Sequence, residues 1–349
     1  MKKVLRPEVQ KKKDNQKIVP LGTPASSYPI AELSYLRGDF DAAGLVLRKR
    51  LSQSVQDFQT HNLYGATLAQ GGQFQEAEKV FLKLRASTKS ATHKEKASFN
   101  LGLVQFYQDL QKTGDISVSK TAFSTRIIAD FVIRPGFVPF ENAIQTWQSI
   151  KKSSPNANVV LTYLSFAHLQ HGDIDKALSL IIQAMERSES FYASHYVAGK
   201  VFLDLYLLGL EENDYFISKK AVDFFEIEPA EVLTEKDGLS CVIRETLLEL
   251  AMQALHAARE MSPYSPEVLL GLYHAYMLAG MYEEAHMALM QAESIAPESL
   301  GVLDGILRFY EHVQNPPETI EFLMQKLKKL NLRKMPVQVQ YLMPSYYLI

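Results

Sequence analysis

The side chains best suited to chemistry in this sequence are two histidines and one cysteine. His168 and His171 lie one helical turn apart with Asp173 close behind, a spacing that could seat a metal ion. Gly172, however, separates Asp173 from the segment that carries the histidines, so we predict a packed histidine and no metal site. Cys241 falls at the expected start of a helix, where a thiolate can be stabilised, but no base stands beside it in sequence, and we predict an inert thiol.

Motifs of known reaction classes are missing from the sequence. There is neither a glycine-rich loop that could cradle a phosphate nor a nucleophile elbow. No region outside the repeats described below is large enough to fold as a catalytic domain. We therefore predict that the chain is not an enzyme and that it carries no cofactor.

The bulk composition is that of a folded globular protein. Of the 349 residues 47% are hydrophobic and 22% charged, and the formal net charge is −2. A single cysteine excludes an internal disulfide framework and suits a reducing compartment. No apolar run approaches the roughly 18–20 residues that span a bilayer, and no apolar stretch of a secretory signal follows Met1. We expect a cytoplasmic protein without a membrane span.

Charge is distributed unevenly along the chain. Residues 1–20 contain seven lysines and arginines against two acidic residues, a net charge of +5, which leaves −7 for the remainder. Pro20 ends this stretch and Pro24 and Pro29 follow, so residues 1–27 are predicted to be a basic disordered tail. Such a tail either stays solvated or serves as a docking arm for an acidic protein, a lipid or RNA.

Four segments centred on glycine repeat one pattern: glycine, a polar residue, a large apolar residue, two intervening residues and alanine. These segments are 37–43, 71–77, 171–177 and 279–285. The alanines recur at a fixed distance of 34 residues, from Ala43 to Ala77, from Ala143 to Ala177 and from Ala251 to Ala285. A period in this range is the signature of a repeat architecture.

Each element of the pattern has a structural reason. The glycine stands where a first helix must end, in a backbone conformation that costs glycine little. The small residue five positions later lets a second helix approach the first closely. Four residues further on, a large apolar side chain lies on the same face of that second helix. This position holds Leu47, Phe81, Trp147, Ile181, Leu255 and Leu289.

In period and pattern the chain resembles the tetratricopeptide repeat family. The family's Leu-Gly pair appears in the first helices as Tyr64-Gly65, Leu101-Gly102 and Ala198-Gly199, whereas its tryptophan near the start of that helix is absent. The resemblance is thus to a divergent member. It implies an all-α fold, a right-handed superhelical solenoid of antiparallel helix pairs with about seven repeats.

Two of these repeats are interrupted. We place the solenoid at residues 28–334, with insertions at about 111–139 and 211–240, each expected to contain an extra helix. The apolar residues of the insertions either dock on the convex side of the solenoid or bind a partner. Residues 335–349 form an apolar C-terminal tail, which either folds back onto the solenoid or serves a partner or a second copy.

The resemblance also implies a concave groove lined by the first helices, which in this family often takes a peptide. Carried over by repeat phase, the predicted partner-binding residues are Asn62, Phe99, Asn100, Phe106, Tyr163, Phe166, Tyr196, Lys200 and His274. The family's chaperone-binding branch uses lysines and asparagines to clamp a carboxylate. Here Tyr28, Glu32 and Phe99 stand where lysines should be, so we do not predict that clamp.

From these features we predict a protein–protein interaction scaffold or adaptor that binds a peptide or helical segment of a partner. One alternative is an RNA-binding helical repeat, which would need a regularly basic groove. Lys200 is the only cation in the predicted set, so no nucleic acid is expected. The other alternative is a structural component that self-associates through residues 335–349.

Overall fold

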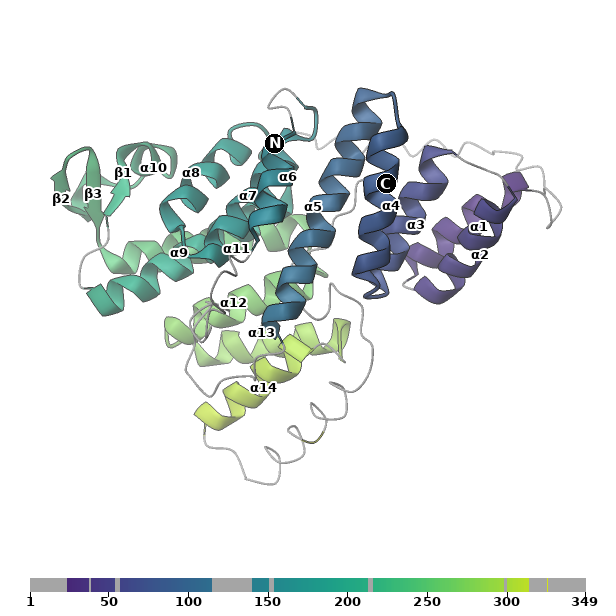
Figure 1. Ribbon diagram of the computed structural model, residues 1–349. Coiled ribbons are helices and arrows are strands. Elements are labelled where there is room, and N and C mark those ends of the chain that lie inside the picture. The colour runs from purple at the N-terminus through teal and green to yellow at the C-terminus, as the bar shows by residue number, and fades with distance from the viewer. Residues whose placement is uncertain are drawn as a thin grey trace, which may run out of the picture.

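The computed structural model describes residues 24–37, 39–53, 57–114, 140–150, 154–212, 216–297, 300–313 and 325. Within these ranges the chain is a row of antiparallel helix pairs, and the second helix of each pair also packs on the first helix of the next (Figure 1). The all-α repeat architecture is confirmed, and the right-handed sense of its superhelix stays a prediction. None of the helices in these ranges is long and apolar enough to cross a membrane.

Four helix pairs are continuous in sequence. They are α1 (Pro24–Leu36) with α2 (Phe40–Ser52), α3 (Phe58–Gln70) with α4 (Phe74–Ser87), α7 (Ala157–His171) with α8 (Ile174–Met185), and α12 (Pro266–Leu278) with α13 (Tyr282–Ile295). Gly72, Gly172 and Gly280 follow the first helices of three of these pairs with φ of +75°, +86° and +72°. This left-handed conformation is the one expected for glycine at a helix end.

The two interrupted repeats also close as predicted. Helix α5 (Ala91–Gly114) packs on α6 (Glu141–Gln148), and α9 (Tyr192–Glu212) packs on α11 (Arg244–Met261). Helix α14 (Leu300–His312) follows and packs on α12 and α13. The helix expected in the first insertion, most of the basic segment 1–27 and the apolar segment 335–349 lie outside the described residues, and the predictions for them stay predictions.

Glycine–aromatic contacts hold the paired helices together. A Cβ atom on Gly65 of α3 would lie 2.7 Å from the Phe81 ring of α4, and one on Gly102 of α5 would lie 2.6 Å from Cδ1 of Trp147 on α6. Both aromatic side chains are fully buried. The small residue in one helix thus makes room for the large one in the next, as the repeat pattern predicts.

The second insertion contains strands that we did not predict. Between α9 and α11 lie β1 (Phe216–Ser218), α10 (Lys219–Phe224), a short 3₁₀ turn (Pro229–Glu231), β2 (Val232–Lys236) and β3 (Leu239–Val242). Helix α10 is the extra helix that was expected. The strands form an antiparallel sheet in the order β1-β3-β2, at the left of Figure 1. We call residues 216–242 the β module.

The β module corrects the placement of Cys241. This residue was expected to begin a helix, but it lies buried in β3, and α11 begins three residues later at Arg244. The reason is local: Asp237 and Gly238 have φ of +53° and +78°, which closes a two-residue turn and returns the chain as a strand.

Candidate partner-binding site

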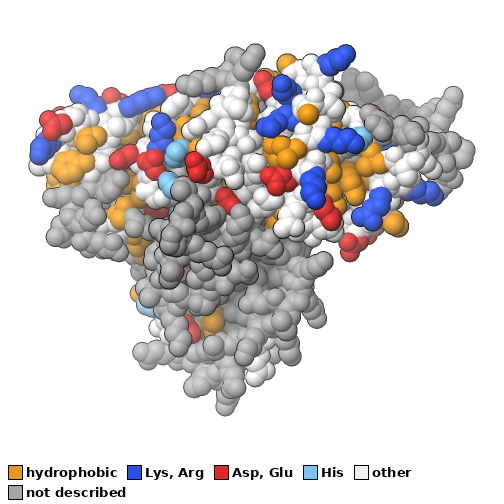
Figure 2. Space-filling view, in the orientation of Figure 1, with side chains coloured by type: hydrophobic (Ala, Val, Ile, Leu, Met, Phe, Trp, Pro, Cys, Tyr) orange, Lys and Arg blue, Asp and Glu red, His pale blue; other side chains and the backbone are white. Residues whose placement is uncertain are grey.

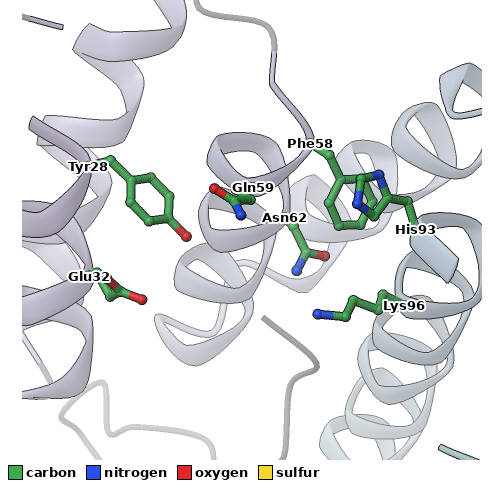
Figure 3. A pocket seen from close by; sticks show the side chains of 7 residues that line it. All are labelled: Tyr28, Glu32, Phe58, Gln59, Asn62, His93 and Lys96. Carbon is green, nitrogen blue, oxygen red and sulfur yellow. The ribbon is translucent and has the colours of Figure 1, made fainter. Parts of the chain in front are cut away.

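A hollow of about 190 Å³ opens where the first helices of the first three repeats lie side by side. Figure 3 shows its lining from α1, α3 and α5: Tyr28, Glu32, Phe58, Gln59, Asn62, His93 and Lys96. We call these seven residues the helix-A hollow. Each of three successive repeats supplies part of the wall, so the hollow exists only because the repeats stack.

The start of α3 is fixed by Asp57, directly before the hollow. Its carboxylate accepts hydrogen bonds from the Thr60 backbone N–H at 2.6 Å and from the Thr60 hydroxyl at 2.7 Å. The Arg50 guanidinium lies 3.4 Å away. Burial alone would raise the pKa of Asp57, but the Thr60 hydrogen bonds and Arg50 outweigh burial and hold that pKa below its usual value. An ionised N-cap therefore anchors the turn that carries Phe58 and Gln59.

Aromatic contacts join the walls of the hollow. The rings of Phe58 on α3 and His93 on α5 are stacked, with centroids 4.0 Å apart and an interplanar angle of 10°. The Arg50 guanidinium lies over the ring of Tyr28, 5.7 Å from its centroid. Burial, and then the nearby Glu32 carboxylate, raise the pKa of Tyr28, so its phenol keeps its proton near neutral pH.

Amide side chains and one cation also lie at the hollow. The Asn100 side-chain N–H donates to the Asn62 side-chain oxygen at 3.0 Å, and both residues are buried. In Figure 3 the ammonium of Lys96 reaches into the hollow from α5, while Glu32 lies on the opposite wall. The hollow therefore presents opposite charges at its two sides with amide groups between them.

The structure places most of the predicted partner-binding residues inside the helix layers. Phe99, Phe106, Tyr163 and Phe166 are at most 4% exposed, and the rings of the first three contact the Trp147 ring. Their ring centroids lie 5.3 Å apart for Phe99 and Tyr163, and 5.7 Å apart for Phe106 and Phe166. The Trp147 indole N–H donates to the Phe99 carbonyl oxygen at 3.0 Å. In this structure these side chains contact neighbouring helices, so direct contact with a partner stays a prediction.

The remaining predicted residues lie further along the row. Tyr196 and Lys200 on α9 are 3% and 9% exposed. Burial raises the pKa of the Tyr196 phenol and lowers that of the Lys200 ammonium, which Asp204 partly offsets. On α12, burial, and then the nearby Lys200 and Arg308, lower the pKa of His274 to about 3. Of the nine predicted partner-binding residues, Asn62 alone lines the helix-A hollow, and the other eight lie elsewhere.

Sequence reasoning missed Lys96 and His93, although a signal was present. His93 and Lys96 lie seven and four residues before the predicted Asn100, so all three fall on one face of α5. The prediction began at Phe99 and extended only toward the C-terminus of the helix. Applying the same periodicity one and two turns toward the N-terminus would have found both side chains.

The chemical candidates of the sequence show no assembled centre. His168 is nearly buried, and its Nδ1 lies 3.4 Å from an Asp173 oxygen. Burial lowers the pKa of His168 more than Asp173 raises it, so the ring is neutral at pH 7. Across the described ranges, no three His, Cys, Asp or Glu side chains are grouped so that they could hold a metal ion.

No known family model matches the sequence, and no curated protein sequence matches it. Solved structures do. A tetratricopeptide repeat protein from Parabacteroides merdae is similar over 89% of this chain and 94% of its own, with a TM-score of 0.50 and 10% identity. A monomeric mutant of IFIT1 with Gppp-AAAA matches over 88% and 68%, with a TM-score of 0.48 and 14% identity. MamA 41-end from Desulfovibrio magneticus RS-1 matches over 55% and 85%, with a TM-score of 0.37 and 15% identity. Such identities establish the fold alone, a divergent tetratricopeptide-like helical repeat.

Proposed function

We propose that the chain is a protein-interaction scaffold whose helix-A hollow binds a segment of a partner protein. The observation that carries the proposal is the meeting of α1, α3 and α5 around one hollow with aromatic, amide and charged side chains. A repeat stack with such a face binds an elongated ligand that runs across several helices.

The size of the hollow favours a protein segment over a small molecule. At about 190 Å³ it lies below the range of roughly 300–1,000 Å³ that is usual for small-molecule pockets. A space of this size accepts one side chain of a longer ligand. The rest of that ligand would lie along the neighbouring helices.

Charge argues against RNA as the principal ligand of the row. Residues 141–312 contain 25 Asp and Glu against 11 Lys and Arg, a net formal charge of −14, and they would repel a phosphate backbone. Residues 24–114 contain 11 Lys and Arg against 8 Asp and Glu, a net charge of only +3. In Figure 2 the cations at the α1–α5 end are interspersed with hydrophobic side chains. A protein segment suits this mixed surface better than a polyanion does.

The chemistry of the lining defines the partner segment. Lys96 would pair with an acidic side chain, and Glu32 with a basic one on the opposite side. Gln59 and Asn62 would hydrogen-bond the peptide backbone, and the stacked Phe58–His93 rings would support an apolar side chain. The segment is therefore an apolar anchor flanked by residues of opposite charge.

The test is a quantitative affinity purification from native cells with the wild-type chain, Lys96→Glu and Lys94→Glu. Lys94 is a matched control because it lies exposed on α5 two residues from Lys96 and does not line the hollow. Partners of the hollow should be lost with Lys96→Glu and retained with Lys94→Glu. Equal recovery with both variants contradicts the proposal. Recovery that RNase abolishes supports the RNA-binding alternative.

A further inference from the structure

A second hollow, separate from the helix-A hollow, lies along β2 in the β module. Its volume is about 460 Å³, and four consecutive residues of β2 line it together with α10 and the turn that follows. The lining residues are Lys219, Val222, Asp223, Ile227, Pro229, Val232, Leu233, Thr234 and Glu235. Successive side chains of a strand point to opposite faces of a sheet. Side chains from both faces of β2 therefore line the hollow, since Val232, Leu233, Thr234 and Glu235 all do so. The hollow thus runs along the edge of the sheet and not over one of its faces.

Strand β2 is an edge strand among the described residues. The sheet order β1-β3-β2 gives β3 two neighbours and β2 one. All of β2 after Val232 is exposed, and Leu233 is 59% exposed. Lys236 and Leu239 flank the two-residue turn, so their backbone groups pair with each other across the hairpin. Along an antiparallel strand the backbone N–H and C=O groups of successive residues point to opposite sides. Those of Glu235, the residue before Lys236, therefore point away from β3 and toward the open edge.

An exposed edge of this kind is a template for another strand. Natural proteins protect such edges with proline, charged side chains, β-bulges or a covering helix. Strand β2 contains no proline, but its pairing with β3 is irregular between Val232 and Thr234, so the regular edge open to a further strand begins at Thr234. Its partly buried Val232, together with Val222 and the buried Ile227, gives the hollow an apolar floor. Backbone pairing along the edge with one apolar side chain on this floor is the arrangement of β-strand addition.

The charge of the module selects the occupant. Residues 219–237 contain six acidic residues against three lysines, a net charge of −3. One of those lysines, Lys220, already pairs with Glu186 at 2.8 Å. Two copies that met edge to edge would bring two negatively charged modules together, whereas a basic segment would be attracted. At the end of the molecule that carries β2 and β3, Figure 2 shows hydrophobic side chains beside both acidic and basic ones.

We propose that the edge of β2 binds an extended, basic segment of a partner protein as a fourth strand, with alternating apolar and lysine or arginine side chains. The apolar side chains enter the hollow between β2 and α10. The basic side chains face Asp223 and Glu235 at its rim. This site is independent of the helix-A hollow and lets one chain hold two partner segments.

The experiment uses the full chain and a labelled peptide of alternating lysine and valine, measured by fluorescence anisotropy. The controls are the same peptide with alternate backbone nitrogens methylated and a peptide with glutamate in place of lysine. Methylation removes backbone donors and keeps the charge. We expect the lysine–valine peptide to bind, methylation to weaken it about tenfold or more, and the glutamate peptide not to bind.

Two variants of one residue locate the site. Glu235→Pro removes the outward N–H and spares the ladder with β3, so it should weaken the peptide about tenfold. Glu235→Gln keeps that N–H and should weaken the peptide about twofold to threefold. Amide hydrogen exchange of the wild-type chain provides a variant-free readout, and binding should slow exchange in residues 232–236 and leave α1, α3 and α5 unchanged.

Several results would overturn the proposal. These are absence of binding, equal affinity for the methylated peptide, full affinity in Glu235→Pro, and protection of α1, α3 and α5 in place of β2. A dimer in sedimentation that Glu235→Pro dissolves would assign the edge to a second copy and overturn it as well. Protection of α1, α3 and α5 would place the peptide in the helix-A hollow, whereas the other results leave the proposal for that hollow unaffected.

Discussion

Replacing Gly102 by alanine should destabilise the chain, although alanine is the better helix former by about 1 kcal/mol. The added Cβ would lie 2.6 Å from Cδ1 of the buried Trp147. Overpacking of this kind costs about 1–3 kcal/mol. The ring cannot retreat without stretching its 3.0 Å hydrogen bond to the Phe99 carbonyl, which adds about 1 kcal/mol. The net expectation is a loss of about 1–3 kcal/mol.

Gly44 offers a matched control on α2. A Cβ there meets only the Thr67 methyl at 3.7 Å, an ordinary contact, so Gly44→Ala should stabilise the chain by about 0.5–1 kcal/mol. Urea unfolding followed by circular dichroism measures both variants, and midpoints are compared at unchanged slope. Trp147, the only tryptophan, reports locally on the same repeat by fluorescence.

The reasoning is refuted if Gly102→Ala stabilises the chain as much as Gly44→Ala does. In that case α5 and α6 would not pack across the first insertion as described. A second arm separates steric cost from other causes. In a Trp147→Leu background the clash is removed, so Gly102→Ala should become neutral or stabilising.

Asp57→Ala should destabilise the chain by about 0.5–2 kcal/mol through loss of the α3 N-cap, with Asp57→Asn costing less, as measured by urea unfolding at pH 7. Because the folded pKa of Asp57 is lowered, the stabilisation by its carboxylate is fully present above the unfolded pKa of 3.8 and is lost as pH falls through the folded pKa. The free energies of unfolding of wild type and Asp57→Asn should therefore converge below this range, and a difference that persists unchanged there would contradict the prediction. Burial lowers the pKa of His274 from 6.5 to about 3, so the unfolded chain takes up a proton there first and stability falls between pH 7 and 4. Wild type should lose about 3 kcal/mol more than His274→Leu over this range, and equal losses in the two chains would show that His274 is accessible and ordinary.

The repeat fold was readable because its determinants act within one helix pair. Gly72 and Gly172 end helices by a backbone preference of their own, and Trp147 marks its helix by a large side chain at fixed spacing from Ala143. Such signals survive an insertion, since α5 and α6 still pair. These sequence signals depend on the geometry of one helix and its turn, and not on how far away in sequence the paired helix lies.

The helix-A hollow was only partly readable because it depends on how three repeats are rotated against one another. The distance from Gly65 to Gly102 is 37 residues, not 34, so transfer by repeat phase placed Phe99 in the groove. The structure instead turns Phe99 against Trp147 and leaves Lys96, one turn earlier, at the surface of the hollow. A shift of three residues moves a side chain by a whole helical turn.

The strands of the β module escaped prediction for a different reason. Their signal was the Asp237-Gly238 turn between short runs of β-forming residues, which is the strongest local mark of a hairpin. The strands have three to five residues, and β1 is far from β3 in sequence. The pairing of β1 with β3 leaves no local signal in the sequence, whereas α10 was visible from its own apolar spacing.

Site-specific photo-crosslinking in native cells tests most directly whether the helix-A hollow binds a protein segment. A photoreactive residue is placed at Gln59 in the helix-A hollow or, as a control, at Lys79 on α4. Both positions are exposed, but only Gln59 lines the hollow. We expect discrete protein adducts from Gln59 that disappear when Lys96→Glu is added, and no such adducts from Lys79. Identical adducts from both positions, adducts unchanged by Lys96→Glu, or RNA in place of protein would contradict it.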